Sequence, residues 1–191
     1  MEKFTQLKMK RLISHSPEMD KAIEIIAAEI HDSPPKFILI KKAKKYYIEF
    51  FTFYDSDNLI GAAYNAIEGD FVNIMLLAVE KNEQSKGYGS KILSLMKERY
   101  LDKRIALGIE EPVGTDTSNE QKEKRKRFYI DKNGFEFSGT KMLLNKIQYD
   151  VLTFNGDYKL KDMKRTYKKF LGFVGSLIVR PKFFIAEEQP K

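Results

Sequence analysis

The sequence predicts a mixed α/β fold in which helices flank one central sheet. Strand-like and helix-like segments follow each other in the order strand, two helices, three consecutive strands, and then helices alternating with strands. The run Phe71 to Val79 is apolar almost throughout, as expected of a central strand that is covered on both faces. Short stretches rich in glycine, asparagine and aspartate separate the strand-like runs and predict tight turns.

Length and composition restrict the classes of function. A chain of 191 residues is long enough for one domain with a substantial core. Cysteine is absent, which excludes disulfides, thiolate metal sites and a cysteinyl covalent intermediate. The first residues lack the apolar segment of a secretory signal, and the longest late apolar run, Leu171 to Val179, is too short to span a bilayer. We therefore expect a cytoplasmic protein with no membrane span and no metal.

The formal net charge of +7 is concentrated near the C-terminus. Residues 1–140 hold 23 Lys and Arg against 22 Asp and Glu, a net charge of +1, and residues 141–191 hold 11 against 5, a net charge of +6. A solvated lysine face explains this excess, and no nucleic-acid-binding motif accompanies it. We expect no nucleic-acid partner. The alternative is a basic interaction module in which Lys159 to Lys169 contact nucleic acid or acidic lipid. A steep fall in nucleic-acid binding with salt would support it.

Two helices are predicted near the N-terminus, after a short alternating strand at Phe4 to Met9. Ser16 suits the N-cap and Pro17 the first position of the first helix. Its apolar residues recur with helical spacing at Ile23, Ile26, Ala27 and Ile30. The stretch from Phe37 to Lys45 is interpreted as a second helix with one side formed by Leu39, Ala43 and Tyr46. A strand over Phe37 to Ile40 is the alternative.

A hairpin and the remaining helices follow. Tyr47 to Tyr54 and Leu59 to Ile67 are predicted to pair around a turn at Asp55 to Asn58. The helix that begins near Tyr88 has an apolar face formed by Ile92, Leu93, Leu95, Met96 and Tyr100. After a strand from Arg104 to Ile109, either of two capping boxes, Thr117 with Glu120 or Ser118 with Gln121, begins a helix that stops at Gly134. Phe135 to Thr153 predicts two strands around Lys146.

The turn between the central strand and the helix near Tyr88 is a candidate anion site. The first N–H groups of a helix have no partner inside the helix, and the helix dipole adds partial positive charge there. A pyrophosphate fits such a place. Gly87 and Gly89 let the backbone turn sharply and approach a ligand closely. The Gly-Lys-Ser/Thr ending of a nucleotide P-loop and the third glycine of a dinucleotide fingerprint are both missing.

The loop Gln84-Ser-Lys-Gly-Tyr-Gly resembles the acyl-CoA pyrophosphate loop of the GNAT superfamily of N-acetyltransferases, in particular its histone-acetyltransferase branch. The segment from Phe128-Tyr129 to Asn133-Gly134-Phe135 resembles the end of the family's fourth helix. The resemblance covers residues 4–155 and implies a mostly antiparallel sheet that splays at the acyl-CoA site. It implies direct transfer of an acetyl group from acetyl-CoA to an amine in a ternary complex.

The resemblance also implies roles for particular residues. Acetyl-CoA would be held by main-chain groups of the loop, and the Lys86 side chain would add positive charge. The residues of the loop are Gln84, Ser85, Lys86, Gly87, Tyr88, Gly89 and Ser90. A backbone N–H of the central strand, within Leu77, Ala78 and Val79, would polarise the thioester carbonyl. Tyr129 is the candidate acid for the departing thiolate. It lies five residues before Gly134 where the family has four, so either the helix end holds an extra residue or Tyr129 is displaced.

The general base is less defined by the resemblance. The branch has a glutamate on the central strand where this chain has Asn73, which cannot accept a proton. Glu110 and Glu111 end the next strand, and strand alternation points them to opposite faces, so at most one faces the acceptor. The function expected is therefore N-acetyl transfer to a small-molecule or protein amine. The alternative is a non-catalytic acyl-CoA-binding regulator or scaffold.

Residues 156–191 lie outside the resemblance and form a basic and apolar extension. Apolar residues recur with helical spacing at Leu160, Met163, Tyr167 and Phe170. A disordered tail is poor in large apolar side chains, so this segment is predicted to pack. Packing on the body of the same chain is favoured over exchange between the chains of a homodimer.

Overall fold

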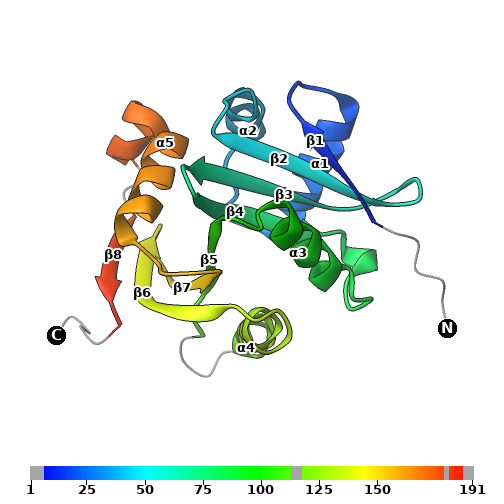
Figure 1. Ribbon diagram of the computed structural model, residues 1–191. Helices are drawn as coiled ribbons and strands as arrows, with labels where there is room; N and C mark the ends of the chain where they lie inside the picture. The colour runs from blue at the N-terminus through cyan, green and yellow to red at the C-terminus, as the bar shows by residue number, and fades with distance from the viewer. Residues whose placement is uncertain (1–6, 113–117, 179–180, 187–191) are drawn as a thin grey trace. The chain divides into compact units, whose positions relative to one another are not determined.

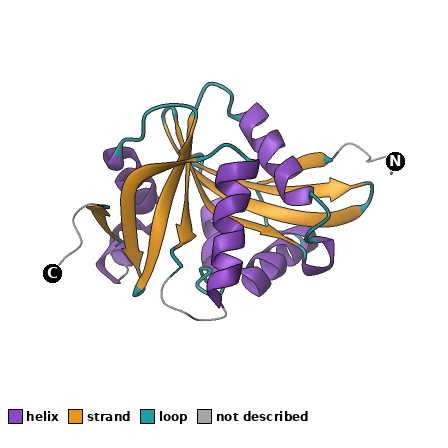
Figure 2. Ribbon diagram, turned by 90° about the horizontal axis from the view of Figure 1, so that it is seen from below, coloured by secondary structure: helices purple, strands orange, loops and turns teal. Residues whose placement is uncertain are grey.

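The computed structural model describes residues 7–112, 118–178 and 181–186, apart from the side chains of 118 and 173–178. The described residues form eight strands and five α-helices, so the predicted mixed α/β class is confirmed (Figure 2). The order of helices and strands is the predicted one. The chain divides into two compact units, one formed by residues 1–67 and 74–100 and the other by residues 68–73 and 101–191.

The first unit contains three α-helices and most of four strands (Figure 1). Its elements in chain order are β1 (Lys8–Leu12), α1 (Pro17–Glu29), α2 (Lys36–Ala43), β2 (Ile48–Asp55), β3 (Asn58–Glu68), β4 (Phe71–Val79), the short 3-10 helix Lys81–Glu83 and α3 (Tyr88–Arg99). The strands lie in the order β1-β2-β3-β4, and β2 is antiparallel to both of its neighbours. The central strand β4 has the predicted bounds.

Local turn and capping signals place these elements. The Ser16 hydroxyl accepts a hydrogen bond of 3.2 Å from the backbone N–H of Met19, which satisfies one N–H of the first turn of α1, and Pro17 is the first residue of the helix. Strands β2 and β3 pair as predicted, with Asp55 opposite Asn58 across a two-residue turn. Ser56 in that turn has a φ of 56°, in the left-handed region that such turns require.

Helices cover both faces of β2 and β3. The even-numbered Thr52 and Tyr54 bond Glu18 of α1 at 2.9 and 2.8 Å, and the Tyr64 hydroxyl bonds the Leu39 carbonyl of α2 at 3.1 Å. On the opposite face, the buried Glu49 accepts hydrogen bonds from Arg99 and Tyr100 at the end of α3. The arrangement follows from strand alternation, which sends successive side chains to opposite faces.

Two predicted side-chain positions near the N-terminus are wrong. Ala27 is exposed, because the buried stripe of α1 runs through Met19, Ala22, Ile23 and Ile26. Tyr46 is 84% exposed, because α2 ends at Ala43 before it can place Tyr46 beside Leu39. The helical interpretation of the α2 region is confirmed over its strand alternative. Residues 4–6 of the strand predicted at Phe4 to Met9 lie outside the described residues, and β1 begins at Lys8.

The second unit is an antiparallel sheet with two α-helices. Its elements are β5 (Arg104–Glu110), α4 (Ser118–Arg127), a π-helical turn (Phe128–Lys132), β6 (Glu136–Leu144), β7 (Ile147–Phe154), α5 (Leu160–Ile178) and β8 (Lys182–Ile185). The strands lie in the order β5-β7-β6-β8. The predicted hairpin around Lys146 is confirmed, with left-handed φ angles of 49° at Asn145 and 69° at Lys146, as in a type I′ turn.

The C-terminal segment makes specific contacts within this second unit. Asp162 of α5 lies 2.8 Å from the Arg104 guanidinium, which also holds Asp70 at 2.8 Å. The predicted apolar side chains Met163, Tyr167 and Phe170 are buried. Gly172 interrupts the helix with a φ of 70°, a backbone conformation that favours glycine. Strand β8 then pairs with β6, and Phe183 contacts the ring of Tyr167.

Candidate functional site

The loop between β4 and α3 turns at Gly87, which is the N-cap of α3. Gly87 has a φ of 83° and a ψ of −1°, a left-handed conformation that side chains other than glycine adopt only with strain. The first hydrogen bond of the helix runs from the Lys91 N–H to the Gly87 carbonyl at 3.3 Å. The N–H groups of residues 88–90 precede that bond and point out of the helix end, where the helix dipole favours an anion.

Gln84 fixes the start of this loop. Its side-chain amide donates to the Val79 carbonyl at 3.1 Å and to a carboxylate oxygen of Glu29 at 2.6 Å. The backbone of Ser85 then takes a left-handed φ of 64°. Gln84 therefore ties the loop to the last residue of β4 and to the end of α1, so its side chain has a structural contact in addition to the main-chain role expected from the resemblance.

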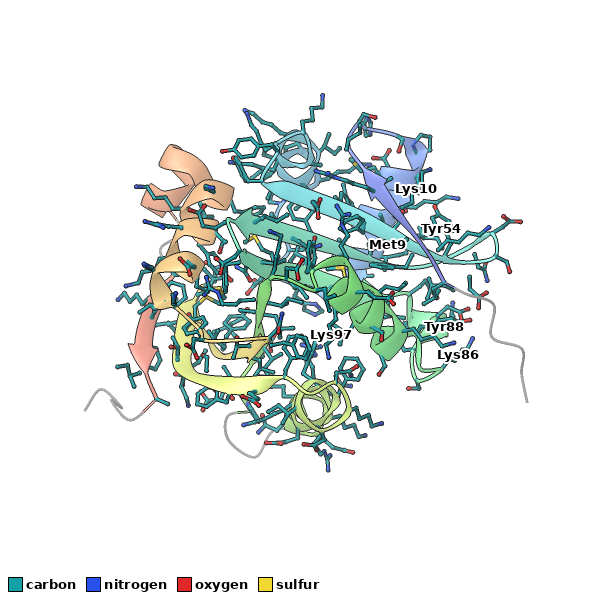
Figure 3. All side chains as sticks on the ribbon, viewed as in Figure 1. Met9, Lys10, Tyr54, Lys86, Tyr88 and Lys97 are labelled. Atoms are coloured by element: carbon teal, nitrogen blue, oxygen red, sulfur yellow. The ribbon has the colours of Figure 1, made fainter. Side chains whose placement is uncertain are left out.

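Lys86 in this loop and Tyr88 at the start of α3, both labelled in Figure 3, each have an acidic partner. The Lys86 ammonium lies 3.1 Å from Glu83 and is about half exposed. The Tyr88 hydroxyl donates to Asp55 at 2.6 Å, which links α3 to the end of β2. The charge of Lys86 is thus partly balanced within the loop by Glu83.

The predicted carbonyl-polarising segment, Leu77 to Val79, leads directly into this loop. Sequence reasoning missed the residue that sets the backbone spacing there, which is Gly61 of β3. A Cβ at Gly61 would lie 2.5 Å from the Ala78 carbonyl oxygen, 3.2 Å from the Ile92 side chain and 3.3 Å from the Val79 Cα. The sequence did contain a signal for this residue, because a glycine inside a largely apolar strand often marks a place where another backbone approaches closely.

Tyr129 lies in a π-helical turn that ends the α4 segment. The turn spans Phe128–Lys132 and precedes Gly134, whose φ is 61°. The Phe135 N–H bonds the Tyr129 carbonyl at 3.1 Å, and the Gly134 N–H bonds the Ile130 carbonyl at 3.0 Å. The helix end therefore holds an extra residue, which is one of the two explanations offered for the five-residue spacing. Single π turns of this kind are frequent at functional sites.

The surroundings of Tyr129 are apolar. Its ring makes edge contacts with Phe128 and Phe135 at centroid distances of 5.0 and 5.8 Å, and only 9% of the residue is exposed. Burial raises the pKa of the Tyr129 hydroxyl to about 12, although the positive charge of Arg125 opposes this. Tyr129 therefore holds its proton throughout the neutral range.

Glu110 and Glu111 differ in their contacts within the second unit. Glu110 lies at the end of β5, 3.5 Å from the Lys122 ammonium of α4. Glu111 accepts hydrogen bonds from both Lys141 and Gln148, and its own N–H bonds the Gln148 carbonyl at 2.9 Å. Glu111 is thus held by two side-chain donors, whereas Glu110 has one ion pair, at 3.5 Å, with the residues that the structure describes.

Asn73, at the position where the histone-acetyltransferase branch has its glutamate, is buried in the second unit. Its amide nitrogen donates to the Thr166 hydroxyl of α5 at 3.1 Å, and its carbonyl oxygen has no hydrogen-bond partner among the described residues. Thr166 in turn donates to the Met163 carbonyl at 2.8 Å. The C-terminal helix therefore covers this position of β4 with a hydroxyl group.

No group of three or more His, Asp or Glu side chains in the part of the chain that the structure describes is arranged to hold a metal ion. No helix among the described residues is both long and apolar enough to cross a membrane.

Comparison with known proteins identifies the fold. No protein-family model matches the sequence, and no curated protein matches it by sequence. Among solved structures, a protein from Bacteroides thetaiotaomicron described as an acetyltransferase of the GNAT family aligns over 88% of this chain and 98% of its own, with a TM-score of 0.61 and 16% identity.

Two further structures were determined with ligands. A GNAT family acetyltransferase from Elizabethkingia anophelis, with acetyl-CoA bound, aligns over 79% of this chain and 99% of its own (TM-score 0.56, 13% identity). Arabidopsis thaliana Naa50, in complex with a bisubstrate analogue, aligns over 80% of this chain and 100% of its own (TM-score 0.56, 18% identity). These likenesses show that the chain has the GNAT acetyltransferase fold.

Proposed function

We propose that the protein is an acetyl-CoA-dependent N-acyltransferase that moves an acetyl group directly to an amine. The observation that carries this proposal is the loop at Gly87, where a left-handed glycine caps α3 and orients its first N–H groups outward. The GNAT fold and the acetyl-CoA found in the Elizabethkingia anophelis structure support it. In this proposal the N–H groups of residues 84–90 hold the pyrophosphate, and the sheet splays beside Leu77 to Val79.

The reaction needs one bond made, one bond broken and two proton movements. The amine nitrogen attacks the thioester carbonyl carbon, the C–N bond forms, and the C–S bond breaks with the electron pair leaving on sulfur. An N–H of Leu77 to Val79 stabilises the negative charge that grows on the carbonyl oxygen. The ammonium proton goes to a base or to water, and the thiolate gains a hydrogen bond and finally a proton.

Tyr129 is proposed to donate a hydrogen bond to the leaving thiolate. The pKa of its hydroxyl, about 12, lies well above the value of about 8.5 for an ordinary thiol. Complete proton transfer from Tyr129 to the thiolate is therefore uphill, but a protonated phenol remains an effective hydrogen-bond donor. Solvent can supply the proton once the thiolate has departed.

Glu110 is the preferred candidate for the base, and Glu111 is retained as a second candidate. Among the described residues, the Glu110 carboxylate has one charged partner, Lys122, whereas Lys141 and Gln148 both donate to Glu111. Asn73 cannot accept a proton, so the glutamate route of the histone-acetyltransferase branch is not proposed.

The acceptor is proposed to be a small-molecule or a protein amine. Arabidopsis thaliana Naa50 was captured with a bisubstrate analogue carrying the peptide MVNAL, and another structural neighbour is a ribosomal-protein-alanine N-acetyltransferase from Escherichia coli. We further propose a cytoplasmic enzyme with a GNAT domain over residues 1–155 and an extension over 156–191 packed on it, exchange in a homodimer being the alternative.

The test combines binding with turnover. Acetyl-CoA affinity is measured by calorimetry, and release of free CoA is followed with a panel of small amines and of peptides with free N-termini or lysines. Amine-dependent CoA release with an acetylated product, identified by mass spectrometry, supports the proposal. Absence of acetyl-CoA binding overturns it.

The second candidate function is acyl-CoA binding without turnover. The observation that favours it is Asn73, which stands where the histone-acetyltransferase branch has a glutamate and donates a hydrogen bond to Thr166. Tight acetyl-CoA binding with no CoA release in the presence of any amine in the panel would select this candidate.

A further inference from the structure

Helix α2 presents a stripe of lysines with a phenylalanine among them. Phe37, Lys41 and Lys44 recur at intervals of four and three residues and are exposed, so they lie on one side of the helix and its C-terminal end. The opposite side is buried through Leu39 and Ala43. Phe37 is 69% exposed, and Tyr46, just beyond the helix, is 84% exposed. Large apolar side chains are thus held outward at both ends of a cationic segment.

The positive charge of this segment is largely unbalanced. Residues 36–45 include five lysines, and residues 33–48 include no acidic residue and no arginine. Lys36 is paired with Asp20 at 2.9 Å. Lys41, Lys44 and Lys45 form no ion pair with any acidic residue that the structure describes. Burial, and after it the charges of Lys45 and Lys41, lower the pKa of Lys42.

A third exposed apolar side chain lies in the turn after β1. His15 and Lys36 both contact the same oxygen of Asp20, at 2.8 and 2.9 Å, so the turn after β1 lies beside the first residue of α2. Ile13 in that turn is 64% exposed. We call Phe37, Lys41, Lys44, Lys45 and Tyr46 together the α2 surface (Figure 1 shows α2).

We propose that the α2 surface docks on an anionic membrane surface. Peripheral membrane-binding elements combine basic residues with large apolar side chains that enter the interface, and this surface has both. Lysine can lay its apolar stem along the acyl boundary while its ammonium stays among the headgroups, and tyrosine suits the same depth. The proposal is independent of the acetyltransferase function.

The composition favours a membrane over an acidic macromolecule. Protein interfaces are depleted in lysine and enriched in arginine, and the cations of residues 36–45 are all lysines. Arginine also stacks on nucleic-acid bases, and none is present here. Headgroup recognition by charge needs neither the bidentate geometry nor the stacking of arginine.

Vesicle binding by the full chain tests the charge. Sedimentation with vesicles of phosphatidylcholine mixed with phosphatidylserine is compared with phosphatidylcholine alone. Each basic residue near an anionic surface contributes about fivefold in partitioning, from about 1 kcal/mol per charge. The variant Lys41→Gln, Lys44→Gln, Lys45→Gln should therefore lose up to about a hundredfold. The matched control Lys161→Gln, Lys164→Gln, Lys168→Gln removes the same charge from α5 and should change partitioning only a few-fold.

A fluorescent reporter tests insertion of the apolar side chains. The sequence contains no tryptophan, so Phe37→Trp places a single reporter on the α2 surface, and Leu101→Trp places one at a similarly exposed position elsewhere. Phosphatidylserine vesicles should shift the emission of the first variant to the blue and leave the second unchanged. Equal loss of binding in both triple variants, no shift at residue 37, or binding to an oligonucleotide or acidic peptide without binding to vesicles would each overturn the proposal.

Discussion

Substitution of Gly87 tests the proposed pyrophosphate site most directly. The φ of 83° at Gly87 costs an L-residue about 1–2 kcal/mol. A Cβ there would meet no atom within 4 Å, so the structure predicts strain without a clash. The smaller conformational freedom of unfolded alanine offsets about 0.4–1 kcal/mol. Gly87→Ala should therefore lower the free energy of unfolding by about 1 kcal/mol, which is about 2–4 °C in Tm for a chain of this size.

Acetyl-CoA affinity should respond more strongly than stability. If the backbone of residues 84–90 contacts the pyrophosphate, a side chain at position 87 occupies space that the ligand needs. Gly87→Val, with its branched side chain, should weaken binding about tenfold or more, equivalent to about 1.4 kcal/mol. Gly87→Asn tolerates the left-handed backbone better, so it should retain most of the Tm and still weaken binding.

Gly69 supplies a matched control for backbone strain. Its φ is 58°, and a Cβ there would also meet nothing within 4 Å, but it lies in the turn between β3 and β4. Gly69→Ala should lower Tm by a similar amount and leave the acetyl-CoA dissociation constant unchanged. Calorimetric titration and thermal unfolding of all four variants provide the assay. An unchanged dissociation constant for Gly87→Val would refute the assignment of the loop as the pyrophosphate site.

Four further predictions concern the remaining parts of the molecule. Tyr129→Phe should lower the rate constant for acetyl transfer by about ten- to a thousandfold with acetyl-CoA affinity unchanged, and a normal rate would reduce Tyr129 to a packing residue. Gly61→Ala should lower the free energy of unfolding in urea by about 1–3 kcal/mol, because its Cβ would lie 2.5 Å from the Ala78 carbonyl; an unaltered midpoint would contradict the tight strand spacing. A hydrogen bond from Arg104 lowers the pKa of Asp70 from 3.8 to about 2, so this pair stabilises the fold above about pH 4 and the contribution is lost as the pH falls through about 2. In the Asp70→Asn variant the free energy of unfolding should therefore depend less on pH in that range. A pH dependence identical to that of the parent protein would show that the pair contributes nothing. Deletion of residues 156–191 removes the buried Met163 and strand β8, so it should lower Tm and solubility, and a truncated protein with the parent's Tm, solubility and oligomeric state would contradict that packing.

Elements with strong local signals were predictable from the sequence. Ser16 and Pro17 define the start of α1 through contacts that span only four residues. The turn from Asp55 to Asn58 likewise defines its hairpin through residues that are adjacent in sequence. The central strand was predictable because a nine-residue run that is apolar except for Asn73 fits a strand covered on both faces. Such features depend on neighbouring residues alone, so they can be read without tertiary contacts.

Features set by contacts distant in sequence were not predictable. The buried stripe of α1 differs from the expected one at Ala27, because packing against β2 through Glu18 selects the face that is buried. The importance of Gly61 depends on how closely Ala78 approaches it, and those residues are 17 positions apart. The capping of Asn73 by Thr166 joins positions 93 residues apart. No periodicity in the sequence encodes these distances.

The position of Tyr129 shows how local geometry changes the meaning of a motif. In a regular α-helix each residue rotates by about 100°, so the fifth and fourth residues before Gly134 would point in clearly different directions. The turn at Phe128–Lys132 is π-helical and absorbs one residue before the bond from the Gly134 N–H to the Ile130 carbonyl closes the helix. Tyr129 is consequently the buried residue of that turn, and Ile130 is only partly buried. A motif that places tyrosine four residues before glycine in a regular helix is therefore compatible with five here, because the extra residue lies in the widened turn.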